Sequence, residues 1–215
     1  MFWLYFLFIL FIIFYFYFSF YKENLTNINN KKIVLLGDSI LENSSYATLS
    51  ILKILENTSH SVLCLAQDDS TIESTYLQIN EIPSNLNNRN TFIFVSVGGN
   101  DILKKYVYKD ILSNKHKNID NIFNQYKLLI LSLKKKMNLS HIILLNIYYP
   151  YSTFYKTYYS LIKEWNLLLQ KFCLKNDFQL LNIAEFMTLE EDFSFEIEPS
   201  SIGSQKISKA ILKSL

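Results

Sequence analysis

The sequence is short of the residues on which several common kinds of site depend. It contains one arginine, Arg89, against 20 lysines, which argues against a surface that reads phosphate or RNA through guanidinium groups. Its two cysteines, Cys64 and Cys173, cannot build a disulfide framework, and no cysteine and histidine cluster has zinc-site spacing. The formal net charge is +2, too small to favour nucleic acid as a partner. We therefore expect no metal, no cofactor and no nucleic-acid partner.

Charge is also missing from the start of the chain. The first 21 residues hold no charged side chain and 13 of the 34 aromatic residues. About 20 apolar residues in a helix cross a hydrocarbon core of roughly 30 Å. No basic residue precedes the run and Ser19 is its only small residue, which favours an uncleaved anchor over a cleaved signal peptide or a buried core helix. We predict a single-pass transmembrane anchor over 1–21, a polar tether over 22–31 and one domain over 32–215.

The side of the membrane on which the domain lies is open at this stage. Lysines at 22, 31 and 32 favour the cytosol under the positive-inside rule. Asn-X-Ser/Thr sequons favour the opposite side, but they are easily accidental in a chain this rich in asparagine. The sequons begin at Asn24, Asn43, Asn57 and Asn138.

Short apolar runs alternate with longer amphipathic stretches through the rest of the chain. The runs are nearly continuous in apolar content, as strands buried on both faces are. They cover 32–37, 61–66, 91–97, 141–147 and 178–183. The stretches of helical length cover 46–56, 70–82, 119–137, 153–175 and 200–215. This alternation predicts an α/β fold, a three-layer α/β/α sandwich around a five-stranded parallel sheet, with ligands at the carboxyl ends of the strands.

Three of the four glycines fall at predicted strand ends, where the backbone must turn sharply or approach a ligand. They are Gly37, Gly98 and Gly99. Ser39 follows the first of these strands closely and can present its hydroxyl at the sheet edge. It is expected to enter a helix there, and an N-cap role is the alternative.

The third predicted strand is followed by an asparagine. The amide of Asn100 can donate to a developing oxyanion, or Asn100 can simply be a turn residue. Two neighbouring carboxylates, those of Asp38 and Asp101, are expected to brace their turns by accepting hydrogen bonds from backbone N–H groups.

With the segments LLGDSI and VSVGGND in place, the sequence resembles the SGNH, or GDSL, hydrolase family over 32–215. The resemblance implies a flavodoxin-like sandwich in which Ser39 is the nucleophile. It also implies that the Asn100 amide, the Ser39 N–H and one further backbone N–H form the oxyanion hole. That further donor is expected at Asp69, which takes the place of the family's usual glycine.

The last block of the family pattern is altered. The family carries Asp-x-x-His before a proline, whereas this chain has Phe195 at the aspartate position and Glu198 at the histidine position, followed by Pro199. No histidine is expected to substitute, because two precede strands at the far edge and one lies in a polar segment. The three are His60, His116 and His141.

A glutamate can replace the histidine as general base only if its pKa rises. The reference pKa values are about 4.3 for glutamate and 6.5 for histidine. Burial near Phe195, Ile197 and Ile202 is expected to raise the pKa of Glu198. The sequence thus predicts a membrane-anchored serine esterase with a Ser39–Glu198 pair, acting on a lipid, an acetylated sugar or a small ester. The same losses also fit a catalytically inactive, membrane-tethered module that binds an acyl or glycan ligand, with Glu198 as a structural, ligand-binding or incidental residue.

Overall fold

The computed structural model describes residues 11–17, 30–107 and 115–215. Its centre is a five-stranded sheet of order β2-β1-β3-β4-β5, in which every neighbouring pair is parallel. The strands are β1 (Lys32–Gly37), β2 (Ser61–Cys64), β3 (Thr91–Ser96), β4 (His141–Leu145) and β5 (Gln179–Leu181). The predicted parallel sheet is confirmed, with strands up to three residues shorter at their ends.

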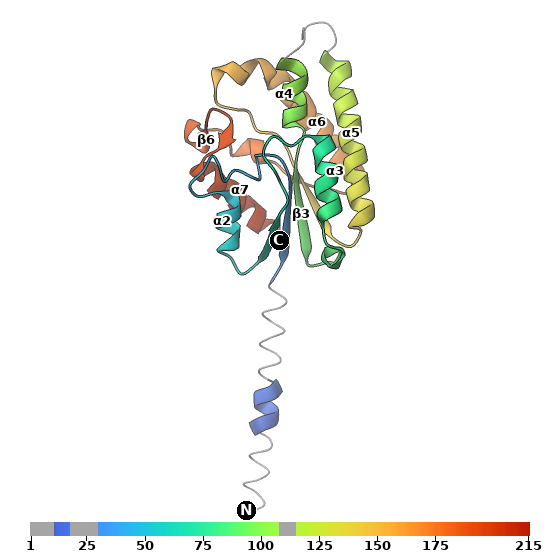
Figure 1. Cartoon of the computed structure of the whole chain (residues 1–215), viewed down its shortest axis with the longest axis vertical. Helices are drawn as coiled ribbons and strands as arrows, with labels where there is room; N and C mark the ends of the chain where they lie inside the picture. The colour runs from blue at the N-terminus through green and yellow to red at the C-terminus, as the bar shows by residue number, and fades with distance from the viewer. Residues whose placement is uncertain (1–10, 18–29, 108–114) are drawn as a thin grey trace, which may run out of the picture.

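Helices cover both faces of this sheet (Figure 1). One face carries α3 (Ile72–Glu81), α4 (Gly99–Val107), α5 (Lys115–Lys136) and α6 (Tyr159–Asn176). The other carries α2 (Ile51–Glu56) and α7 (Ser201–Lys213). Two separate apolar cores, one on each side of the sheet, fill the space between the layers. The three-layer sandwich is therefore confirmed.

The helices depart from their predicted bounds in informative ways. The stretch 46–56 is helical only over α2, because buried Asn43 holds the preceding chain in turns and accepts the Ile51 N–H at 3.1 Å. Ser50 then caps α2 by accepting the N–H of Lys53. The stretch 153–175 divides into a 3-10 helix, η2 (Thr153–Tyr158), and α6. Short 3-10 turns also occur at Ser84–Leu86, Ile183–Glu185 and Glu190–Asp192.

Two elements were not predicted. Helix α4 begins at Gly99, where two glycines, an asparagine and an aspartate suggest a turn. A small antiparallel hairpin, β6 (Phe193–Ser194) and β7 (Glu198–Pro199), precedes α7. Both elements lie next to the pocket described below.

The predicted anchor falls mostly outside the described residues. Only 11–17 of residues 1–21 are described, and they are helical. None of the helices in the described ranges combines the length and the apolar character needed to cross a membrane. The anchor and the tether remain predictions.

The chain enters the sheet at the amino ends of its strands, opposite the edge formed by their carboxyl ends. The N–H of Lys31 donates to His60 Nδ1 at 3.2 Å, just before β1 and β2 begin. The His141 ring stacks on Phe92 with centroids 4.5 Å apart, at the start of β3 and β4. These two histidines therefore lie at the amino edge, as expected, a full strand length from Ser39.

Gly98 provides a stability test of this packing. Its φ is +117°, and an added Cβ would lie 2.3 Å from a ring carbon of the fully buried Trp165. We expect Gly98→Ala to lower the free energy of unfolding by about 2–4 kcal/mol, measured by urea unfolding of the full chain in mild detergent. Gly99→Ala is the matched control, because the nearest atom to its added Cβ is 3.9 Å away. Equal losses in the two variants would contradict this account.

Candidate active site

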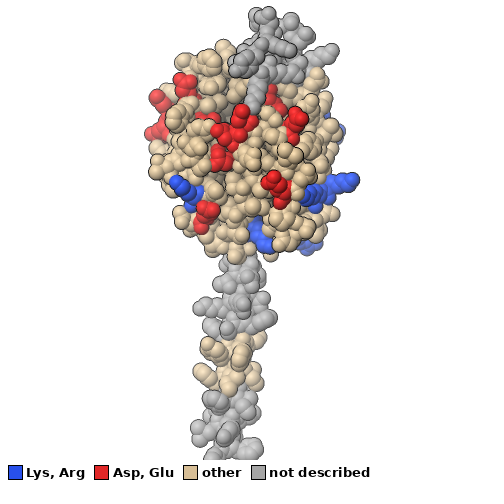
Figure 2. Space-filling model, viewed as in Figure 1, with Lys and Arg blue, Asp and Glu red and all other residues tan. Residues whose placement is uncertain are grey.

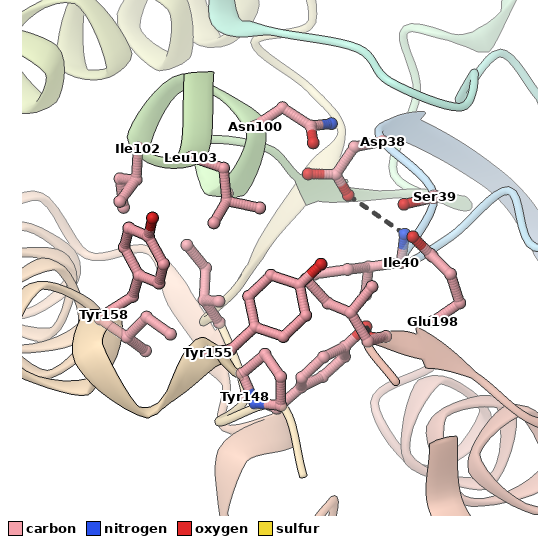
Figure 3. A pocket seen from close by; sticks show the side chains of 15 residues that line it. Asp38, Ser39, Ile40, Asn100, Ile102, Leu103, Tyr148, Tyr155, Tyr158 and Glu198 are labelled. Carbon is pink, nitrogen blue, oxygen red and sulfur yellow. Dashed lines mark hydrogen bonds between the residues drawn. The ribbon is translucent and has the colours of Figure 1, made fainter. Parts of the chain in front are cut away.

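A pocket opens at the carboxyl edge of the sheet (Figure 3). Its polar side is formed by Asp38, Ser39, Asn100 and Glu198, which come from the ends of β1 and β3 and from β7. The opposite wall is apolar and aromatic. It is formed by Ile40, Ile102, Leu103, Ile147, Tyr148, Pro150, Tyr155, Tyr158, Ile162 and Ile197. The structure thus brings together Ser39, Asn100 and Glu198, although the first and last of them are 159 positions apart in the sequence.

Ser39 lies in a tight turn directly after β1. The backbone N–H groups of Leu41 and Glu42 both donate to the Asp38 carbonyl oxygen, at 3.1 and 3.0 Å. The next helix begins only at Ile51, so the expected helix after Ser39 and its N-cap alternative are both wrong. The residue is 8% exposed. None of the described residues accepts its backbone N–H, which leaves that donor available to a ligand.

Asp38 braces the turn, as predicted. Its Oδ1 accepts the Ile40 N–H at 3.2 Å and the Ser96 hydroxyl at 3.1 Å. Burial raises the pKa of Asp38 to about 8, against the lowering effect of these hydrogen bonds, and the charges of Glu198 and Asp101 raise it further.

Asn100 lies in the first turn of α4, whose first residues line the pocket. Its Nδ2 donates to the Ser70 carbonyl oxygen at 3.0 Å, and an amide nitrogen carries a second hydrogen for a ligand. The N-terminus of α4 thus places a positive helix end at the pocket. The carboxylate of Asp101 reaches a second segment of the chain. Both its carboxylate oxygens accept the N–H of Ile72, at 3.3 and 3.0 Å, at the start of α3.

Asp69 has the backbone conformation expected of a glycine. Its φ is +59°, in the left-handed region that aspartate tolerates better than most residues. Its N–H, however, donates to Asp68 Oδ1 at 2.8 Å. The other oxygen of that carboxylate accepts the Tyr46 hydroxyl. The expected backbone donor of the oxyanion hole is therefore engaged by a neighbouring side chain.

Glu198 is held by the β6–β7 hairpin, with its carboxylate turned toward Ser39 (Figure 3). Burial raises the pKa of Glu198 to about 7; the hydrogen bond with Ser39 lowers it, and the charges of Asp68 and Glu42 raise it. Its Oε2 is buried and has no hydrogen-bond partner in the described part of the chain. Such an oxygen can accept a proton or bind a ligand group.

Two of the three residues expected to bury Glu198 are themselves exposed. Phe195 is 74% exposed and Ile202 41% exposed. Ile197 does line the pocket, and its carbonyl oxygen accepts the hydroxyl of buried Tyr148 at 2.7 Å. Sequence analysis did not single out Tyr148, because one tyrosine among several after β4 carries no distinguishing signal.

Acidic side chains gather around this end of the molecule. In Figure 2 most of the visible ones lie in the half that holds the carboxyl ends of the strands, with most Lys and Arg toward the other end. No group of three or more His, Cys, Asp or Glu among the described residues is arranged to hold a metal ion. The side chain of His116 lies outside the described part of the chain.

The raised carboxyl pKa values predict a stability that falls with pH. The pKa of Glu198 is about 7 in the folded protein against an ordinary value of 4.5, and that of Asp38 is about 8 against 3.8. The unfolded chain releases these protons first as the pH rises, so the free energy of unfolding decreases through this range. We expect Glu198→Gln to flatten the decrease between about pH 4.5 and 7, and Asp38→Asn to flatten it between about pH 3.8 and 8, so that the decrease above pH 7 depends mainly on Asp38. Urea unfolding from pH 4 to 9 measures this, and a wild-type profile that rises with pH would contradict it.

The fold and the positions of these residues define a class. A parallel five-stranded sandwich with a serine after its first strand, an asparagine after its third and a carboxylate just before its last helix has the fold of the SGNH, or GDSL, hydrolases. The predicted resemblance is confirmed at the level of the fold.

The fold is similar to those of several solved structures. A lipase from a goat rumen metagenome has 17% identity and a TM-score of 0.68 over 86% of this chain and 97% of its own. A lipolytic G-D-S-L family member from Veillonella parvula has 15% identity and a TM-score of 0.66, over 85% and 97%. A catalytic mutant of an acetylxylan esterase from Geobacillus stearothermophilus has 14% identity and a TM-score of 0.64, over 85% and 93%. No protein-family model and no curated protein sequence matches the chain.

Proposed function

We propose that the protein is a serine hydrolase of carboxylic esters, with Ser39 as nucleophile and Glu198 as general base. The observation that carries the proposal is the placement of Glu198, whose carboxylate faces Ser39 across the polar side of the pocket (Figure 3) and has its pKa raised by burial to about 7. A base works best when its pKa lies near the working pH, because it is then both ionised and basic enough. Burial has given Glu198 the pKa that a histidine would have.

The reaction follows from this pair. Ser39 Oγ attacks the acyl carbonyl carbon while Glu198 accepts the hydroxyl proton. Glu198 then returns the proton to the leaving alkoxide, which departs as an alcohol and leaves an acyl group on Ser39. Water then attacks that ester while Glu198 accepts its proton, and Glu198 returns the proton to Ser39 Oγ as the acid leaves.

The tetrahedral oxyanion has three proposed donors. The Ser39 N–H and one hydrogen of the Asn100 amide are open to the pocket, and the Asp69 N–H is the third. The N-terminus of α4 adds a positive partial charge beside them. This chemistry requires no metal and no cofactor.

The loss of the family's aspartate is consistent with this mechanism. An aspartate normally orients a histidine and stabilises the imidazolium that forms. Beside a glutamate base it would add like-charge repulsion to a site that already holds Asp38, Asp68 and Glu42. Phe195, which stands at that position, points into solvent at the tip of the hairpin.

The apolar wall of the pocket suits the acyl part of an ester. It is made of isoleucines, tyrosines and a proline, with no charged residue among them. Lipids, acetylated sugars and small esters remain the candidate substrates. Among the structural neighbours, one is called a lipase and another an acetylxylan esterase.

The test is hydrolysis of p-nitrophenyl acetate from pH 4 to 9. We expect kcat/KM to rise with pH along a limb centred near 7, since Glu198 must be ionised. Both Ser39→Ala and Glu198→Gln should lower kcat/KM by about 10²- to 10⁴-fold. Glu81→Gln, a change to an exposed carboxylate at the far end of α3, is the control and should match wild type. Full activity in Glu198→Gln would rule out this base.

A second candidate is a catalytically inactive module that binds an acyl or glycan ligand in the same pocket. The absence of the Asp-His pair and the engaged Asp69 N–H favour it. A serine-directed fluorophosphonate separates the two candidates, because only an activated Ser39 reacts with it. Labelling of wild type but not of Glu198→Gln supports the hydrolase.

We also propose that residues 1–21 anchor the protein in a membrane as a single-pass segment. The support is their lack of charge and the entry of the chain at the amino edge of the sheet, opposite the pocket. We expect the full chain to stay in the membrane pellet after alkaline carbonate extraction, and a chain starting at residue 22 to be soluble. Release of the full chain by carbonate would contradict an integral anchor.

A further inference from the structure

The hydroxyl of Tyr46 and the backbone N–H of Asp69 together hold the carboxylate of Asp68 beside the site. Asp68 Oδ1 accepts the N–H of Asp69 at 2.8 Å, and Asp68 Oδ2 accepts the hydroxyl of Tyr46. Neither Tyr46 nor Asp68 lines the pocket. The carboxylate is thus fixed from two sides, and one of its two partners is the backbone donor that the proposed function assigns to the oxyanion.

The same N–H cannot serve both acceptors at full strength. A well-aligned N–H group makes one strong hydrogen bond, and both acceptors are negatively charged oxygens. The charge of Asp68 also acts on the catalytic pair, since it contributes to raising the pKa of Glu198. An oxyanion that uses all three donors therefore requires the Asp68 carboxylate to move away.

We propose that Tyr46 and Asp68 form a latch that closes the oxyanion hole in the free protein and opens when an ester binds. This inference rests on the proposed function. It makes Asp68 a positioning residue that lowers the rate of ester hydrolysis by engaging the Asp69 N–H until an ester binds. A closed latch lowers the apparent kcat/KM by the fraction of molecules that are open.

The latch has a route by which it can open. Asp68 is an exposed side chain, so rotation about its χ1 angle moves the carboxylate into solvent without displacing packed neighbours. Tyr46 packs on Phe195, at the tip of the hairpin that carries Glu198, with ring centroids 5.8 Å apart. The Ser194 hydroxyl donates to the Tyr46 carbonyl oxygen at 3.1 Å. The latch therefore connects the loop of the oxyanion hole with the hairpin of the base.

The hairpin tip is also strained. Phe195 and Glu196 have φ values of +46° and +71°, a left-handed conformation that is unfavourable for residues other than glycine. The contact of Phe195 with Tyr46 is one of the interactions that can offset this cost. Movement of Tyr46 therefore reaches the element that holds Glu198.

A different role for Asp68 makes the opposite prediction. If its hydrogen bond only supports the left-handed conformation of Asp69, then removing Asp68 should damage the oxyanion hole and lower activity. If Asp68 is a latch, removing it should free the donor and raise activity. The direction of the change separates the two roles.

The experiment uses the full chain in mild detergent, with Asp68→Ala and Tyr46→Phe. It measures p-nitrophenyl acetate hydrolysis against pH, and the rate at which a fluorophosphonate labels Ser39. In the labelled enzyme the phosphoryl oxygen takes the place of the oxyanion. We expect Asp68→Ala to raise both plateau rates by about threefold to tenfold and to move the acidic limb to lower pH. Tyr46→Phe keeps the ring contact with Phe195 and should raise the plateau less.

Glu42→Gln is the matched control for charge. The charge of Glu42, like that of Asp68, raises the pKa of Glu198. The Glu42 carboxylate accepts the hydroxyl of Ser44, and not an N–H of the loop that carries Asp69. The other titratable groups beside Glu198 are Asp38, Tyr148 and Tyr155, whose pKa values its charge raises. We expect Glu42→Gln to shift the limb to lower pH without raising the plateau.

The outcomes separate the latch from the function on which it rests. A plateau that falls or stays unchanged in Asp68→Ala, with Ser39 still labelled in wild type, overturns the latch alone. An equal plateau gain in Glu42→Gln also overturns it, because charge would then account for the effect. Absence of labelling in wild type and in Asp68→Ala overturns the hydrolase and the latch together.

Discussion

The site depends on the close joining of two strand ends. The Asp38 N–H donates to the Ser96 carbonyl oxygen at 2.9 Å, and the Ser96 hydroxyl donates back to the Asp38 carboxylate at 3.1 Å. The approach is so tight that a Cβ at Gly37 would lie 1.7 Å from that same carbonyl oxygen. This pairing sets the turn of Ser39 beside the start of α4, and everything else in the site is arranged around these two segments.

The electrostatics of the pocket centre on the buried carboxylate of Glu198. Burial, together with the charges of Asp68 and Glu42, raises its pKa to about 7, as the proposed base requires. Burial also raises the pKa of Asp38 to about 8, with a smaller contribution from the charges of Glu198 and Asp101. The accumulation of acidic groups therefore serves the proposed base, at a cost in stability that increases with pH.

Local patterns predicted most of the framework. Continuous apolar runs identified all five strands. The three central strands, β1, β3 and β4, are almost fully buried and therefore need apolar side chains on both faces, whereas the edge strands β2 and β5 are only half-buried. Ser39 and Asn100 could be placed at one edge because parallel strands bring their carboxyl ends together. Helix α4 was missed because glycine and asparagine at its first turn suggest a loop, and its helical character depends on packing that includes the fully buried side chain of Ile102.

The sequence by itself determined the α/β alternation and the residue types at the strand ends, which are properties of composition and spacing and require no knowledge of contacts. The family resemblance added the expectation of a histidine at the position where this chain has Glu198. The tertiary structure decided how buried Glu198 is, which helix points its N-terminus at the pocket, and that Asp68 and Tyr46 engage the backbone of Asp69. Those features depend on distances between segments far apart in the chain, since burial and charge coupling arise only when the hairpin, the turn after β1 and the loop after β2 are folded together.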